Sequence, residues 1–336
     1  MTKVTIKDVA KAAGVSYATV SRAYSGSSGI SEETRERIIR VGNDMGYTPN
    51  IVARSMVKRE TNTIGLIIPA IENPYMSEFT GYLEARARQV GYNIMVCSSG
   101  YNLELEKDAL QLLVGKQVDG IIIMPVESDS SKSVHMLTGG IPSVFVGENG
   151  ADQNDYQVYV DNFTGTKLGT EYLYSLGHKK IVYLGYRKDS QTHKRRLEGY
   201  LAACSELELE PEILNNNFRR SSQQAGYMIG KLYFSRPREH TAIFCASDVL
   251  AIGVMQAADE VGVRIPEDVS VMGYDNVSFT ALPRIDLTTV DQSLKEMADA
   301  SFMMLLEQIM GEEKRDVKKA LMPVIVERGT CRMIGC

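Results

Sequence analysis

Short apolar runs recur along residues 61–330, and polar residues, glycine or proline bound each of them. Runs of this length that are apolar throughout are typical of strands buried on both faces of a parallel sheet. The predicted strands cover residues 63–68, 93–97, 120–124, 143–146, 180–184, 242–246, 269–273 and 321–327.

Between these runs the apolar positions change to helical spacing, as in residues 75–90 and 105–116. This alternation of strands and helices predicts doubly wound α/β packing with parallel sheets. At roughly 150 residues per domain, the length leaves room for two or three domains.

Residues 1–48 follow a different pattern, in which glycine and serine separate three short helical segments. Thr5 precedes the first helix, and Gly14 ends it. Ser16 is expected to cap a second helix over residues 17–24, and Ser31 a third helix that ends at Gly46. Three short helices with a tight glycine turn between the first two are the layout of a helix-turn-helix unit.

The second of these helices presents Tyr17, Ala18, Ser21 and Arg22 outward and turns Val20 inward. In a helix-turn-helix unit this helix enters the major groove, where an arginine can donate two hydrogen bonds to guanine. The alternative is a solvated surface arginine beside a half-buried ring. The DNA contacts predicted in this region are Thr5, Ser16, Tyr17, Ala18, Ser21 and Arg22.

Charge favours the DNA interpretation because it is unevenly distributed. Residues 1–60 hold ten basic and six acidic residues, a net charge of +4, and since the whole chain carries −5, the rest carries −9. A basic head on an acidic body is expected when only the head meets a polyanion.

Composition excludes several other classes of protein. A hydrophobic fraction of 44% and a charged fraction of 24% are those of a soluble globular protein. The first residues resemble no signal peptide, and no apolar run approaches the ~20 residues that span a bilayer. The five cysteines are odd in number and form no CxxC pair, so reduced thiols in a cytoplasmic protein are expected.

Sequence motifs of enzymes are missing from the chain. It contains no G-x-S-x-G, no P-loop and no His/Cys cluster at metal-ligand spacing. We therefore expect no catalytic residues, no metal and no cofactor.

Nine segments together resemble the LacI/GalR family of bacterial transcriptional regulators, from residue 4 to about residue 330. They are TIKDVAKAAGVSYATVSRAYSG, SEETRERI, GYTPNIVARSM, TIGLIIP, DGIIIM, LGHKKIVYLG, ASDVLAIG, IPEDVSVMGYDN and LTTVDQ. Each segment alone has modest specificity, whereas their order and spacing are highly specific.

The resemblance implies four parts. They are a helix-turn-helix domain (1–48), a hinge helix or linker (49–60), a two-lobed effector-binding and dimerisation domain (61–330) and a tail (331–336). The body would resemble a periplasmic sugar-binding protein, with crossing strands between its lobes. Lobe one would hold about 61–160 plus 291–320, and lobe two about 161–290 plus the C-terminal strand.

Ligands of open α/β sheets bind outside the carboxyl ends of the strands. This rule selects Asn73 and Tyr75, Glu148, Asp248 and Asp275, each of which follows a predicted strand. Carboxylates and amides there suit a hydroxyl-rich ligand, and Tyr75 could stack on the apolar face of a sugar.

The resemblance adds Arg196 and strengthens Asp275, which lies where the family places a ligand carboxylate. The alternatives are a turn former for Asp275, a helix N-cap for Asp248 and a surface charge for Arg196. Many relatives carry an acid directly after the strand 143–146, whereas here Gly147 stands there and Glu148 follows.

The linker NIVARSMVKRET carries an apolar side chain, Met56, among basic residues. Asn50 is a plausible N-cap, Ala53 would allow two copies to pack closely, and Arg54 can reach phosphates. The resemblance implies that Met56 occupies the family's leucine position, as a wedge in the minor groove of the operator. The alternative is a packing contact between linker and body.

Three functions remain in competition. The first is a repressor that binds a pseudopalindromic double-stranded DNA operator as a homodimer and responds to a small effector, a carbohydrate. The second is a DNA-binding regulator with a protein co-effector. The third is a sugar-binding sensor protein whose basic head is incidental.

Overall fold

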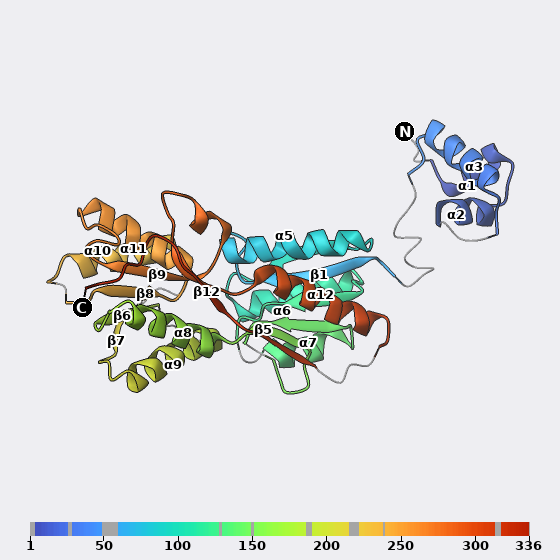
Figure 1. Cartoon of the computed structure of the whole chain (residues 1–336). Helices are drawn as coiled ribbons and strands as arrows, with labels where there is room; N and C mark the ends of the chain where they lie inside the picture. The colour runs from blue at the N-terminus through green and yellow to red at the C-terminus, as the bar shows by residue number, and fades with distance from the viewer. Residues whose placement is uncertain are drawn as a thin grey trace. The chain divides into compact units, whose positions relative to one another are not determined.

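A computed structural model describes residues 4–25, 29–48, 60–127, 130–148, 151–185, 190–214, 222–237, 239–312 and 317–335. The chain divides into two compact units, Met1–Thr61 and Asn62–Cys336, called here the head and the body (Figure 1). None of the helices in the described ranges is long and apolar enough to cross a membrane.

The head contains the helices α1 (Ile6–Ala13), α2 (Tyr17–Ser25) and α3 (Glu32–Asp44). Thr5 opens α1, where its backbone N–H and its hydroxyl both donate to the Asp8 carboxylate, at 2.9 and 2.7 Å. Ser16 opens α2, where its hydroxyl oxygen accepts from the backbone N–H of Thr19 at 3.1 Å. Each helix therefore begins at the cap that the sequence predicts.

Six small or branched side chains form the core of the head: Val9, Ala10, Ala13, Val20, Ala23 and Ile38. Gly42 allows α3 to approach α2, because a Cβ atom there would lie 1.9 Å from the Tyr24 hydroxyl oxygen. Val20 is fully buried, as predicted, so the opposite side of α2 is left exposed.

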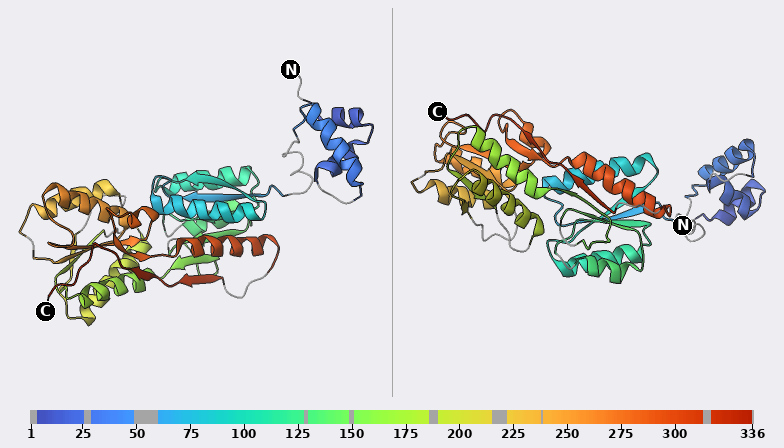
Figure 2. Two further views of the ribbon diagram at one scale, coloured as in Figure 1. Left: turned by 45° about the horizontal axis from the view of Figure 1, so that its top comes forward. Right: turned by 60° about the horizontal axis from the view of Figure 1, so that its bottom comes forward.

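The body is built from two lobes, each with a six-stranded sheet at its centre (Figures 1 and 2). In lobe one every strand pair is parallel, in the order β11-β5-β4-β3-β1-β2. The strands of lobe one are β1 (Thr63–Ile68), β2 (Asn93–Ser98), β3 (Gly120–Ile123), β4 (Ser143–Val146), β5 (Gln157–Val160) and β11 (Lys318–Leu321).

Helices cover both faces of the sheet of lobe one. On one face lie α5 (Pro74–Gln89) and α12 (Leu294–Ile309), and on the other α6 (Leu103–Gly115) and α7 (Ser130–Thr138). Because both faces are covered, β1, β3 and β4 are almost wholly buried, and their buried residues are all apolar or glycine.

In lobe two the strand order is β12-β10-β9-β8-β6-β7, and β12 alone runs antiparallel to its neighbour. The strands are β6 (Ile181–Leu184), β7 (Glu212–Leu214), β8 (Ala242–Cys245), β9 (Ser270–Asp275), β10 (Thr288–Asp291) and β12 (Val324–Val326). The helices are α8 (Asn162–Ser175), α9 (Gln191–Glu206), α10 (Gln223–Phe234), α11 (Asp248–Glu260) and the short 3₁₀ helix η1 (Ser278–Ala281).

Figure 1 shows α10 and α11 on one side of the sheet of lobe two, and α8 and α9 on the other. Two glycines let α8 pack closely on this sheet. A Cβ atom on Gly165 would lie 2.3 Å from the Tyr274 hydroxyl oxygen, and one on Gly169 would lie 2.5 Å from Phe244. The glycines of this segment thus serve close packing.

Seven of the eight predicted strands match the structure within two residues at each end. The eighth, 321–327, is wrong as a single strand, because it contains the end of β11 in lobe one and all of β12 in lobe two. Pro323 lies between them and has no N–H to continue a ladder. The strands β5, β7 and β10 were not predicted.

The chain passes between the lobes three times in the part that the structure describes. The crossings lie between β5 and α8, between β10 and α12, and between β11 and β12. The doubly wound fold with crossing strands is therefore confirmed.

Candidate functional site

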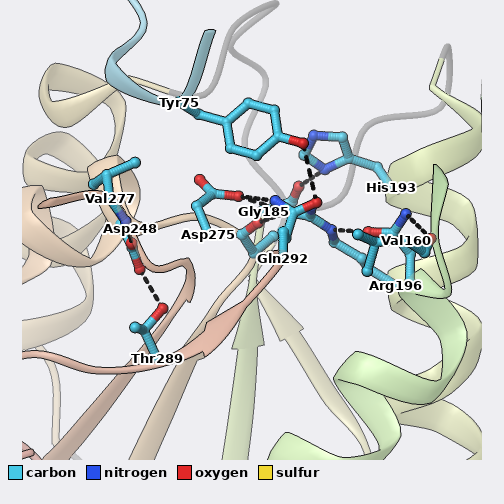
Figure 3. A network of polar contacts seen from close by, with 12 residues as sticks. Tyr75, Val160, Gly185, His193, Arg196, Asp248, Asp275, Val277, Thr289 and Gln292 are labelled. Atoms are coloured by element: carbon cyan, nitrogen blue, oxygen red, sulfur yellow. Dashed lines mark hydrogen bonds and ion pairs between the residues drawn. The ribbon is translucent and has the colours of Figure 1, made fainter. Parts of the chain in front are cut away.

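A cavity of about 150 Å³ lies between the two lobes, at the carboxyl ends of several strands. From lobe one its lining is mostly apolar and includes Pro69, Tyr75, Met76, Met124, Val126 and Met297. From lobe two its lining is polar and includes Asn162, Ser190, His193, Arg196, Ser247 and Asp275. Figure 3 shows the network of polar contacts at this place.

Arg196 lies on α9, lines the cavity and is otherwise buried. Its Nε donates to Asn162 Oδ1 at 2.7 Å, and its Nη1 donates to the carbonyl oxygen of Ala246. Its guanidinium carbon lies 3.7 Å from the centre of the Tyr274 ring, a cation–π distance. The planar group is thus fixed from several directions.

Asn162, the first residue of α8, links Arg196 to Glu148. Its Nδ2 donates to Glu148 Oε2 at 2.8 Å, which leaves Oδ1 to accept from Arg196. Burial raises the pKa of the Glu148 carboxyl to about 7, whereas the bond from Asn162 and the charge of Arg195 lower it. Gly147 lines the cavity and Glu148 does not, so Glu148 acts on the cavity surface through Asn162.

Asp275 ends β9 and turns its carboxylate toward the cavity. Oδ1 accepts from Gln292 Nε2 at 2.6 Å and lies 3.6 Å from Arg196 Nη1. Burial raises the pKa of this carboxyl, and the Arg196 guanidinium acts in the opposite direction. The backbone φ of Asp275 is +134°, a conformation that residues other than glycine rarely adopt.

Tyr75 and Asn73 reach the cavity from the start of α5, as predicted from the strand-end rule. Asn73 caps this helix, since its Oδ1 accepts from the backbone N–H of Tyr75 at 3.0 Å. The Tyr75 hydroxyl makes only long contacts, 3.4 Å to Gln292 Oε1 and 3.5 Å to Met297 Sδ. Burial raises the pKa of Tyr75, so its hydroxyl stays protonated.

Asp248 does not line the cavity, which corrects its assignment to the ligand site. Its side chain is fully buried, and its carboxylate accepts from the Thr289 hydroxyl at 2.5 Å and from the backbone N–H of Val277 at 3.0 Å. The preceding residue, Ser247, is the one that reaches the cavity. It is 6% exposed, and its hydroxyl has no hydrogen-bond partner within the described structure.

A buried hydroxyl without a partner is uncommon, because leaving it unpaired is unfavourable. Ser247 lines the cavity, and its Oγ is a buried polar atom without a partner within the described structure. Ser247 also caps α11 in sequence but makes no capping bond with its side chain.

On the head, Thr5, Ser16, Tyr17, Ala18, Ser21 and Arg22 are all exposed. Tyr17 is 60% exposed, so the prediction of a free outer side on α2 is confirmed, whereas contact with DNA stays a prediction. The hinge positions Asn50, Ala53, Arg54 and Met56 lie outside the described residues.

Sequence reasoning missed Asn162, His193, Ser247 and Gln292 as cavity residues. Asn162 and Gln292 follow β5 and β10, two of the three strands that were not predicted, so the ends of these strands were not searched. His193 lies on α9, where its Nδ1 donates to the carbonyl oxygen of Gly185 at 2.6 Å. Only the three-residue spacing to Arg196 on one helix could have indicated it.

No group of three His, Cys, Asp or Glu side chains in the described ranges could hold a metal ion. In the described ranges, the four cysteines are free thiols: Cys97, Cys204, Cys245 and Cys331.

The protein combines a helix-turn-helix unit with a two-lobed α/β body that has a cavity between its lobes. This combination defines a class of proteins, the transcription regulators that have a DNA-binding domain and a ligand-binding domain. Comparison with known proteins gives the family. Residues 5–50 match the family described as bacterial regulatory proteins, lacI family, and residues 170–331 match the periplasmic binding protein-like domain.

One relative is the HTH-type transcriptional repressor PurR of Pasteurella multocida, 32% identical over 329 residues, which are 96% of this chain and 97% of that protein. A Lac repressor dimer bound to operator and an anti-inducer superposes with a TM-score of 0.87 at 28% identity, over 98% of this chain and 100% of that one. A LacI family regulator from Enterococcus faecium with bound ribose superposes with a TM-score of 0.73 at 26% identity, over 81% of this chain and 100% of that one.

The chain therefore belongs to the LacI family of bacterial transcription regulators, and the resemblance seen in the sequence is confirmed. Membership makes it a DNA-binding regulator rather than an enzyme.

Proposed function

We propose that this regulator is a cytoplasmic repressor that binds its operator as a homodimer and is controlled by a small neutral ligand in the interlobe cavity. The observation that carries the ligand part is the buried, unpartnered hydroxyl of Ser247 among the polar side chains that line the cavity. A bound molecule with a polar atom at that point would satisfy it.

The ligand is a monosaccharide, or a nucleoside or base of similar size. The cavity volume of about 150 Å³ is below the roughly 300–1,000 Å³ of sites for drug-sized ligands, which favours a molecule with one ring. Arg196 and Asp275 face each other across 3.6 Å, and their opposite charges leave no excess for an ionic ligand. The ribose-bound relative supports the same class of ligand.

Each side chain has a defined task in this proposal. Asp275 accepts hydrogen bonds from ligand hydroxyls, Arg196 donates, and Ser247 does either. Tyr75 lies against the apolar face of the ring. Glu148 acts only by orienting Asn162, and Asn73 acts by starting α5 at the cavity edge.

Two heads of the dimer read the half-sites of a pseudopalindrome through Tyr17, Ala18, Ser21 and Arg22, while Thr5 and Ser16 face the phosphates at the ends of α1 and α2. Each head carries +4. If the pair neutralises about 6–10 phosphates, affinity should fall about 10³–10⁵-fold between 50 and 200 mM salt. An operator affinity that does not respond to salt would contradict this part.

The hinge completes the DNA contacts, with Asn50 as a cap, Ala53 at the dimer axis, Arg54 on phosphate and Met56 as a wedge between base pairs. Met56→Ala should weaken operator binding and leave ligand affinity unchanged. Met228→Ala, which removes an exposed methionine of α10, is the matched control and should change neither. Equal operator affinity of both variants would refute the wedge.

The decisive experiment is a ligand screen with the full-length protein. Thermal unfolding is followed with pentoses, hexoses, nucleosides and free bases, and each hit is then titrated against an operator selected from random duplexes. A ligand at 100 times its dissociation constant should stabilise the body by about 2.7 kcal/mol, and its coupling to DNA should be about 1–3 kcal/mol. If no compound stabilises the protein, the ligand proposal fails, and a protein co-effector is the next candidate.

A further inference from the structure

Asp248 is fully buried and outside the cavity, yet both oxygens of its carboxylate accept hydrogen bonds. The donors are the Thr289 hydroxyl at 2.5 Å and the backbone N–H of Val277 at 3.0 Å. Asp248, in the first turn of α11, is thus tied by hydrogen bonds to the segment that follows β9 and to β10 (Figure 3).

The backbone of this turn is held in an unfavourable conformation. Asp275 has a φ of +134° and Asn276 a φ of +58°, two successive non-glycine residues with positive φ. Such conformations persist where the surrounding contacts impose them, and they cluster at binding sites. The hydrogen bond from the Val277 amide to Asp248 is a contact of this kind.

Two further residues make room for this arrangement and brace it. A Cβ atom on Gly273 would lie 2.2 Å from Asp248 Oδ1, so glycine there lets the carboxylate reach β10. From another side, the Arg328 guanidinium donates to Asn276 Oδ1 at 2.6 Å and to the carbonyl oxygen of Leu287 at 2.7 Å.

We propose that Asp248 is a positioning residue of the cavity: it holds residues 275–277 so that the Asp275 carboxylate faces Gln292 and Arg196, and Arg328 braces the same turn. The proposal rests on the ligand role proposed above for Asp275. It explains why an aspartate next to the cavity surface makes no contact with the cavity. An N-terminal carboxylate that served only α11 would bond to amides of its own helix, whereas the Asp248 carboxylate bonds to the turn and to β10.

The test uses full-length protein without ligand. Asp248→Asn retains the shape of the side chain but removes its charge and replaces one of the two acceptor oxygens by an NH2 group. We expect amide hydrogen exchange in residues 275–278 to accelerate at least about tenfold, because the Val277 amide no longer donates to a charged acceptor. A crystal structure of the variant should show Asp275 Oδ1 displaced from Gln292 Nε2.

A second variant keeps the proposal testable if Asp248→Asn does not fold. Thr289→Val removes one of the donors that fix the carboxylate and retains the shape of the residue. It should produce a smaller acceleration at the same amides.

Asp155→Asn is the matched control. Asp155 is 4% exposed in lobe one, and its carboxylate accepts from the Ser131 hydroxyl at 2.6 Å and from the Asp152 N–H at 2.7 Å. The control should destabilise the protein without changing exchange at residues 275–278, which separates positioning from loss of overall stability.

The proposal would be overturned if Asp248→Asn and Thr289→Val both fold and show wild-type amide hydrogen exchange at residues 275–278, with Asp275 in its wild-type position. Because neither readout requires a ligand, this failure is distinct from failure of the ligand screen. A screen without hits would remove the ligand role of Asp275, while the exchange result would still decide whether Asp248 holds the turn.

Discussion

The two walls of the cavity differ in chemistry, although both are built at the carboxyl ends of parallel strands. The wall of lobe one is formed largely by proline, methionine and valine, with Tyr75 as its main polar group. The wall of lobe two is formed by Asn162, Ser190, His193, Arg196, Ser247 and Asp275.

This difference indicates that the two walls contact different parts of a ligand. An apolar wall can cover the C–H face of a ring and exclude water, while a polar wall fixes its orientation through hydrogen bonds. A ligand that fits both walls has one apolar and one polar face, as a monosaccharide has. Variants on the polar wall should therefore have large effects on ligand binding, and loss of the Tyr75 hydroxyl on the apolar wall a small one.

The largest effect is expected for Arg196→Met, which leaves the buried Asp275 carboxylate without its cation. Breaking a buried pair in this way should cost about 3–5 kcal/mol of stability, measured by urea unfolding without ligand. Arg88 of α5 is the control, since its side chain is 77% exposed and its partner Glu84 is a surface residue. Arg88→Met should cost roughly 0–1 kcal/mol. Equal stability of the two variants would show that Arg196 is not fixed as described.

Ser247→Ala should weaken ligand binding by about 1–3 kcal/mol, or roughly 5–150-fold, and leave the stability of the free protein unchanged. The reason is that its hydroxyl has no partner to lose until a ligand is bound. Ser190→Ala is the contrasting variant, because Ser190 caps α9 through the backbone N–H of His193. It should lower stability by about 1 kcal/mol without ligand. Calorimetric titration and thermal unfolding of both variants separate the two behaviours.

Glu148→Gln should alter the dependence of stability on pH. Because burial raises the pKa of the Glu148 carboxyl to about 7, from a usual value of 4.5, the folded protein binds a proton more tightly than the unfolded chain does. The contribution of Glu148 to stability is therefore fully present below pH 4.5 and is lost as pH rises through 7. Glutamine does not titrate, so the unfolding temperature of the variant relative to wild type should rise between pH 5 and pH 8. A difference that stays constant over this range would contradict the pKa shift.

The smallest effect is expected for Tyr75→Phe. Its hydroxyl lies 3.4 Å from Gln292 Oε1, too far for a strong hydrogen bond, so ligand affinity should change by less than about threefold. Tyr75→Ala removes the ring as well and should reduce affinity far more, as measured by the same titration. A large loss for Tyr75→Phe would show that lobe one also supplies a polar contact, and the division between the walls would no longer hold.

Much of the head could be predicted from the sequence, because its exposed and buried sides follow from the helical period alone. Val20 is buried while Tyr17, Ala18 and Ser21 are exposed, as the spacing requires. The apolar strands of the body could be predicted for a similar reason, since burial on both faces requires an apolar side chain at each position.

The cavity could be predicted only in part, because its residues come from elements that the apolar pattern does not reveal. The strand β10 begins with two threonines that are fully buried, since the hydroxyl of Thr288 bonds to the carbonyl oxygen of Arg328 and that of Thr289 to Asp248. Such pairing depends on residues about 40 positions away, so the strand looks too polar in isolation. Gln292, which follows it, was missed for that reason.

Asp248 and Ser247 show a second limit of the sequence. The strand-end rule located the correct turn, but which of two adjacent side chains faces the cavity depends on where α11 begins. A shift of one residue changes the direction of a side chain by about 100° on a helix. The turn could therefore be predicted from the sequence, and the contacting residue could not.

Asn162 and Gln292 lie on two of the crossings between the lobes as well as on the cavity surface. A molecule that binds these two side chains lies close to the axis of any rotation of one lobe against the other. In such a rotation, the displacement of an atom grows with its distance from the axis. The strand β1 is six residues long, so its first residue lies roughly 20 Å from the end that faces the cavity. The chain enters lobe one at this first residue of β1. A small rotation at the ligand would therefore give a larger displacement at residue 62.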